Sequence, residues 1–274
     1  MIKGIIKVIL VIFIVFSFNA CEDKSSQESK SQEIVYIATL PMPEWDEVGG
    51  KKIWDAYKNW HDAKHDPIPA TQIGYAYANK LQDYEKALQW FEYSNSMKPT
   101  ADNSAYACYV LQEMKQYDKA IKWCNDSIIQ ESNKEALFML GTVYYDVEQY
   151  NKAIEYYKLS ANKGFTDALT NIGYIYEEKL KDYKEAEQWY LKAVKEKSYK
   201  GFHGLSYLYY SKLNDNVKSS AYAIALIGTK YSQRSVLKIL QKERKIPNET
   251  IKKGYELQLT SDEFPIKYKG NLGL

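Results

Sequence analysis

Histidine and cysteine are the residue types of this 274-residue chain best suited to metal or redox chemistry, and each occurs three times. His61 and His65 are four residues apart, a spacing that places both imidazoles on one face of a helix, as a zinc site needs. The spacing supplies no third ligand, and no glutamate lies between the histidines as in a metalloprotease motif. A metal pair and a solvated helix face are both consistent with these residues, and we expect no metal and no cofactor.

Motifs for other chemistry are not found in the sequence. It contains no phosphate-binding loop, no nucleophile elbow and no pair of catalytic carboxylates. The 37 basic and 35 acidic residues nearly balance, and no basic run is interleaved with aromatics. Nucleic acid is therefore not an expected partner. These observations favour a binding or structural protein over an enzyme.

The first cysteine follows a segment that resembles an export signal. Two lysines precede an unbroken apolar run over 8–16, which is too short to cross a bilayer. Ala20 and Cys21 end this segment and resemble the lipobox of bacterial lipoproteins. That resemblance implies a signal peptide over 1–20 and acyl chains such as palmitate on Cys21. The alternatives are an uncleaved anchor and a signal cut elsewhere.

The next segments connect this signal to the folded body. Residues 21–33 are polar, rich in serine and free of aromatics, so we expect a flexible tether. Residues 34–67 are expected to form an extended arm and an N-terminal capping helix, which the tryptophans at 54 and 60 place near 52–64. A lipid on Cys21 with this tether predicts a membrane-anchored protein of the bacterial cell envelope, periplasmic or surface-facing.

A repeated pattern dominates the rest of the chain. The segments DYEKALQWF, QYDKAIKWC, QYNKAIEYY and DYKEAEQWY begin at 83, 116, 149 and 182, so each starts 33 residues after the last. Each carries a tyrosine, then an alanine three residues later, then a residue four further on that is aromatic in three of the four copies. A glycine or cysteine upstream completes the pattern at Gly74, Cys108, Gly141 and Gly173. This length is that of one helix-turn-helix repeat.

The pattern resembles the tetratricopeptide repeat and the related Sel1-like repeat. The resemblance covers 68–232, where a fifth, degenerate copy follows the four clear ones, and it implies an all-α fold. The expected architecture is a right-handed α-solenoid of four to five antiparallel helix pairs, with capping helices at both ends and the C-terminal ones within 233–274. The small residue and the alanine allow close helix contact, the tyrosine fills the turn, and the aromatic fills the space between repeats.

Cys108 and Cys124 occupy the small position and the aromatic position of the second repeat. Because these two faces meet in the repeat, a disulfide is one expectation and a pair of buried free thiols is the other. The disulfide forms only if the two helices bring the α-carbons of Cys108 and Cys124 close enough for a bond between the sulfurs, and otherwise the thiols stay free.

The first helices of such repeats line a concave groove, which is the expected binding surface. The candidate groove residues are Tyr75, Asn79, Tyr109, Gln112, Glu113, Thr142, Tyr145, Asp146, Tyr174 and Glu177. Tyrosine mixed with acid and amide groups is suited to peptide contact and favours a basic or neutral segment. An alternative is that these tyrosines only pack against one another.

The leading hypothesis is a membrane-anchored repeat scaffold that binds an envelope protein or peptide. A Sel1-like enzyme or a binder of cell-wall-derived ligands is the second hypothesis, and a purely structural envelope component is the third.

Overall fold

The structure is a computed structural model that describes residue 40 and residues 67–274. The predicted signal peptide, the tether, the capping helix near 52–64 and the histidines at 61 and 65 lie outside these residues. Two compact units are distinguished, Met1–Met97 and Lys98–Leu274, and each is described by itself.

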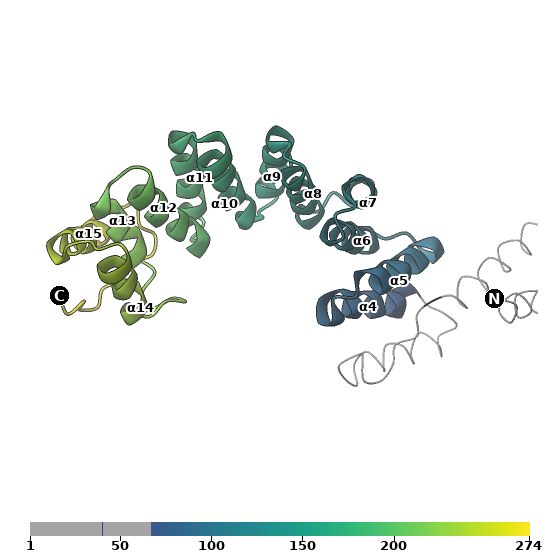
Figure 1. Ribbon diagram of the computed structural model, residues 1–274, viewed down its shortest axis with the longest axis horizontal. Helices are drawn as coiled ribbons and strands as arrows, with labels where there is room; N and C mark the ends of the chain where they lie inside the picture. The colour runs from purple at the N-terminus through teal and green to yellow at the C-terminus, as the bar shows by residue number, and fades with distance from the viewer. Residues whose placement is uncertain (1–39, 41–66) are drawn as a thin grey trace, which may run out of the picture. The chain divides into compact units, whose positions relative to one another are not determined.

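The described residues are helical and contain no β-strand, as expected (Figure 1). The first unit holds α4 (Pro67–Ala76), its π-helical continuation η1 (Tyr77–Leu81) and α5 (Tyr84–Met97). The second unit holds α6 (Ala101–Glu113), α7 (Tyr117–Gln130), α8 (Lys134–Asp146), α9 (Tyr150–Asn162), α10 (Thr166–Tyr174) with η2 (Ile175–Leu180), α11 (Tyr183–Lys195), α12 (Tyr199–Ser211), α13 (Asn216–Ile224), α14 (Gln233–Leu237) with η3 (Lys238–Glu243), and α15 (Asn248–Thr260).

Consecutive helices pack in pairs, α4 on α5, α6 on α7, α8 on α9, α10 on α11 and α12 on α13. Within the second unit each pair also packs on the next, because α7 contacts α8, α9 contacts α10 and α11 contacts α12. This consecutive packing is that of a tetratricopeptide or Sel1-like solenoid, as predicted. The C-terminal helix α15 packs on α13, where a further pair would otherwise lie.

The repeated residues occupy the places that join the two helices of a pair. The tyrosines at 84, 117, 150 and 183 are the first residues of α5, α7, α9 and α11. A Cβ on Gly141 would lie 2.7 Å from the Tyr157 ring, and a Cβ on Gly173 would lie 2.7 Å from the Tyr190 ring. Glycine is needed at these positions because the aromatic ring of the second helix fills the space of its side chain.

The fifth pair uses polar contacts where the first, third and fourth pairs use glycine and alanine. Ser206 and Ser219 replace them, and each hydroxyl donates to the other residue's carbonyl oxygen, at 2.8 and 3.0 Å. Arg244, which follows η3, donates to both hydroxyls at 2.7 and 2.8 Å. A buried polar pair needs such partners, so the C-terminal segment and the fifth pair stabilise each other.

Candidate functional site

The first helices of neighbouring pairs lie side by side in the second unit. Helix α6 contacts α8, and α10 contacts α12. Lys200 at the start of α12 pairs with Asp167 at the start of α10, with 2.6 Å between Nζ and Oδ2. Residues at matching positions of these helices are therefore close enough to form one surface.

Four of the candidate groove residues are joined by contacts between pairs. Gln112 Nε2 donates to Asp146 Oδ2 at 2.8 Å, which links α6 to α8. The rings of Tyr145 and Tyr174 have centroids 6.3 Å apart, which links α8 to α10. Tyr174 keeps 47% of its surface exposed. Burial and the neighbouring Tyr174 raise the pKa of Tyr145.

A lysine that the repeat pattern does not predict joins this group. The Lys179 ammonium lies 5.4 Å from the Tyr145 ring centroid and 5.7 Å from that of Tyr150. Lys179 lies in η2, where a π-helical turn accommodates the extra residue of the KLKDY segment and shifts the register of the side chains. That extra residue is the sequence signal for the shift. We call Gln112, Tyr145, Asp146, Tyr174 and Lys179 the first-helix surface.

Two other candidate residues, the partly buried Thr142 and the buried Glu177, are held by contacts between helices. Thr142 accepts a hydrogen bond from the Tyr157 hydroxyl at 3.0 Å and donates to the Phe138 carbonyl oxygen at 3.0 Å. Glu177 is 2% exposed and accepts from the Tyr190 hydroxyl at 2.9 Å. Burial raises the pKa of Glu177. These contacts hold Thr142 and Glu177 between helices, whereas both side chains were expected to line the groove and face a ligand.

The remaining candidates are distributed over both units. Tyr75 and Asn79 belong to the first unit, where Tyr75 is largely exposed and Asn79 Nδ2 donates to its carbonyl oxygen at 3.1 Å. Tyr109 is half-buried on α6 and Glu113 is exposed at the end of the same helix. Only Tyr109 and Glu113 therefore share a unit with the first-helix surface.

Cys108 and Cys124 are joined by a disulfide, with 1.99 Å between the sulfurs and 5.2 Å between the α-carbons. Both cysteines are fully buried. They occupy the positions of Gly141 and Tyr157 in the next pair, so a covalent bond takes the place of the contact between glycine and ring.

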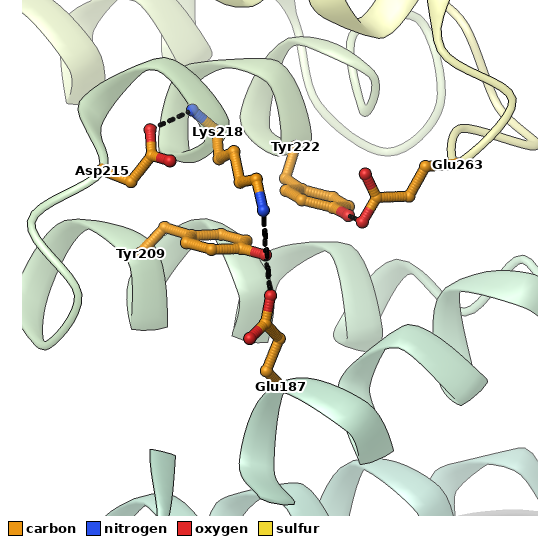
Figure 2. A network of polar contacts seen from close by, with 6 residues as sticks. All are labelled: Glu187, Tyr209, Asp215, Lys218, Tyr222 and Glu263. Atoms are coloured by element: carbon orange, nitrogen blue, oxygen red, sulfur yellow. Dashed lines mark hydrogen bonds and ion pairs between the residues drawn. The ribbon is translucent and has the colours of Figure 1, made fainter. Parts of the chain in front are cut away.

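A polar network near the C-terminal end contains two tyrosines, Tyr209 and Tyr222, whose pKa values are strongly raised (Figure 2). The Tyr209 hydroxyl donates to Glu187 and accepts from Lys218 Nζ at 3.1 Å. The Tyr222 hydroxyl donates to Glu263. Burial, followed by the hydrogen-bonded carboxylates, raises the pKa of both tyrosines, so both hydroxyls remain donors.

The same arrangement occurs elsewhere in the array without the carboxylates. Tyr209 stacks on Tyr222 with centroids 5.7 Å apart, and Tyr144 stacks on Tyr156 at the matching repeat positions, 5.3 Å apart. The lysine before the alanine or serine position lies over the first-helix tyrosine in three pairs, Lys86 on Tyr77 at 5.5 Å, Lys152 on Tyr144 at 5.0 Å and Lys218 on Tyr209 at 4.8 Å. Because the arrangement recurs, we interpret the network as packing that joins α11, α12, α13 and the C-terminal segment.

Residue 40 and residues 67–274 contain no cluster of three ligating side chains that could hold a metal ion. Within the same residues no helix combines the length and the apolar character needed to cross a bilayer.

Two family models match parts of the chain. The model described as a tetratricopeptide repeat matches residues 166–198. The model described as anaphase-promoting complex, cyclosome, subunit 3 matches residues 80–160. Comparison with curated proteins gives no match.

Solved structures share the fold at low sequence identity. The C-terminal part of a TPR repeat-containing protein from Cytophaga hutchinsonii is 16% identical with a TM-score of 0.55, and the match covers 77% of this chain and 89% of that chain. The protective antigen c5321 of uropathogenic Escherichia coli, which displays an SLR fold, is 18% identical with a TM-score of 0.54 over 90% of this chain and 60% of that chain. PilF of Pseudomonas aeruginosa is 19% identical with a TM-score of 0.53 over 78% of this chain and 97% of that chain. Together with the helix pairs, these matches show that the chain has the fold of tetratricopeptide- and Sel1-like repeat proteins.

Proposed function

We propose that this protein is an exported, lipid-anchored scaffold of the bacterial cell envelope that binds a protein or peptide on its first-helix surface. The observation that carries the binding proposal is the contact between Tyr145 and Tyr174, which extends an aromatic surface across two repeats while Tyr174 stays 47% exposed. Exposed tyrosines that form a continuous patch are typical of interaction surfaces.

The chemistry of this surface suits a peptide with backbone and side-chain polar groups. The tyrosines supply hydroxyl donors on rigid rings, Asp146 supplies a carboxylate, and Lys179 supplies an ammonium group. The Asp146 carboxylate is already held by Gln112, so it is preorganised to accept a further donor. A basic or neutral segment remains the favoured partner, with Lys179 positioned over the tyrosine rings.

Location in the envelope is supported by two features. Residues 1–20 resemble a lipoprotein signal, and the Cys108–Cys124 disulfide is of a kind that persists in oxidising compartments such as the periplasm. Several acyl chains on Cys21 anchor a protein firmly, whereas a single chain does not.

The binding surface is tested by site-specific photocrosslinking in the native envelope. A photoreactive amino acid at position 174 is expected to capture a partner, and the same residue at 129 is not, because Ile129 is 81% exposed but lies on the second helix α7. In a second experiment the photoreactive amino acid replaces Lys179. The double variant Tyr145→Ala, Tyr174→Ala is then expected to capture about tenfold less partner than the protein with both tyrosines, since two aromatic contacts are lost. Equal capture at 174 and 129, or full capture by the double variant, would refute the assignment of this surface.

The lipid anchor is tested separately by metabolic labelling with an alkyne fatty acid. Wild-type protein is expected to incorporate the label and to sediment with membranes, because the Cys21 thiol is the acceptor in the proposed lipobox. Cys21→Ser is expected to lose both properties, while the double variant Cys108→Ala, Cys124→Ala keeps them. Label that persists in Cys21→Ser would disprove lipidation at this residue without affecting the peptide-binding proposal.

A further inference from the structure

A cavity of about 500 Å³ lies between the end of α9, the start of α10 and the C-terminal half of α11. Its volume falls within the range of ligand pockets in proteins. The residues of the first-helix surface are not among those that line it. The cavity is therefore a separate feature of the third and fourth helix pairs.

Positive charge predominates among the side chains that line the cavity. Lys158 comes from α9, and Lys192 and Lys195 come from α11, whereas Glu196 is the single acidic lining residue. Within the part of the chain that the structure describes, none of the three lysines belongs to an ion pair. Three lysines that line one cavity beside a single glutamate favour an anionic ligand.

Backbone geometry adds to this positive potential. Helix α10 begins at Thr166, which lines the cavity, and no side chain caps its N-terminus. The first amide groups of a helix carry a partial positive charge and attract anions. This effect reinforces the lysines, which carry the argument.

The cavity also has an apolar wall formed by Trp189 and Leu169. The Lys192 ammonium lies 3.6 Å from the centroid of the Trp189 ring, and the Lys158 ammonium lies 5.4 Å from it. The ring holds both ammonium groups beside an apolar surface. A ligand that fits both parts has a carboxylate next to an apolar side chain.

We propose that this cavity binds an acidic peptide segment, in which carboxylates pair with Lys158, Lys192 and Lys195 and a neighbouring apolar side chain packs on Trp189 and Leu169. The near balance of 37 basic and 35 acidic residues favours a peptide over nucleic acid, because an extended polyanion is bound by a long basic surface. The proposal goes beyond the first-helix surface and would give the scaffold a second binding site.

The test uses the purified protein and a fluorescein-labelled peptide in which two phenylalanines are flanked by four glutamates. At low salt we expect fluorescence anisotropy to give a Kd at least about tenfold lower for this peptide than for the same peptide with glutamines. The variant Lys192→Glu, Lys195→Glu is expected to weaken binding of the glutamate peptide at least about tenfold, because it replaces attraction with repulsion in the cavity.

A matched control changes the same charge at the same spacing on another helix. Lys119 and Lys122 are exposed on α7, also three residues apart, and Lys119→Glu, Lys122→Glu is expected to leave the Kd within about twofold. Tyr145→Ala, Tyr174→Ala is also expected to bind the peptide normally, which separates this site from the first-helix surface. Circular dichroism establishes that each variant is folded.

Several outcomes would overturn the proposal. Equal binding of the glutamate and glutamine peptides would exclude carboxylate recognition. If Lys119→Glu, Lys122→Glu weakened binding as much as Lys192→Glu, Lys195→Glu, the effect would come from the net charge of the protein and not from the cavity. Tighter binding of heparin or single-stranded DNA, with the same dependence on Lys192 and Lys195, would assign the cavity to another polyanion. No binding of the glutamate peptide by folded wild-type protein would remove the site altogether.

Discussion

Replacing Tyr222 with alanine is expected to lower the free energy of unfolding of the second unit by about 3–5 kcal/mol, the cost of truncating a large buried aromatic. Tyr222 is fully buried, and its ring centroid lies 5.7 Å from that of Tyr209 and 4.6 Å from that of Phe264. Its hydroxyl also donates to Glu263, which attaches the C-terminal segment to α13 (Figure 2). One side chain thus joins the last helix pair to the end of the chain.

The phenylalanine variant separates the two contributions. Tyr222→Phe keeps the ring and removes the hydroxyl, so we expect a loss of about 1–2 kcal/mol for one hydrogen bond to a partly exposed carboxylate. Urea unfolding followed by circular dichroism measures both variants. Tyr156→Ala serves as the control at the matching position of the third pair, and its partly exposed ring predicts a smaller loss, about 1–2 kcal/mol. If Tyr222→Ala and Tyr222→Phe lost the same amount, ring packing would not be the main contribution.

Breaking the Cys108–Cys124 disulfide is expected to lower the free energy of unfolding by about 3 kcal/mol, the loop-closure value for a loop of this size. The two cysteines are separated by 16 positions and join α6 to α7 inside one helix pair. For a unit of this length, the loss corresponds to a fall in Tm of about 6–12 °C. Thermal unfolding with and without a reductant, and of Cys108→Ala, Cys124→Ala, measures it.

The repeat supplies a matched rescue variant for this experiment. Cys108→Gly with Cys124→Tyr recreates the contact that Gly141 makes with Tyr157 and Gly173 makes with Tyr190. We expect this variant to recover about half or more of the loss, since a large buried ring contributes a few kcal/mol. A melting temperature that does not change on reduction would show that the disulfide adds nothing to the stability of the second pair.

The repeated positions explain why the fold was predictable from the sequence. Tyr117, Tyr150 and Tyr183 were expected in the turn and do begin the second helices α7, α9 and α11. A glycine at one position and an aromatic ring at another encode a contact within one pair, over a short stretch of chain. Local contacts of this kind repeat with the sequence, so their spacing alone specifies the helix pairs.

The candidate surface was less predictable. Tyr145 and Tyr174 were among the expected groove residues, and their rings do lie together. Glu177 was expected there too, but the π-helical turn η2 places it beside Tyr190 in the interior. The same turn positions Lys179 over the tyrosine rings. One extra residue in a turn changes which side chains face outward. Positions assigned from the 33-residue spacing alone do not include that change.

The spacing of the repeated residues specifies that the chain folds as paired helices, where each second helix begins, and which small and aromatic residues meet inside a pair. Only the tertiary structure placed Lys158 of α9 near Lys192 of α11 around Trp189, and Arg244 against Ser206 and Ser219. The first set of contacts arises between residues close in the chain, where spacing fixes geometry. The second set joins residues 25 to 38 positions apart or in different pairs, so it depends on how one pair stacks on the next and how the C-terminal segment closes the array.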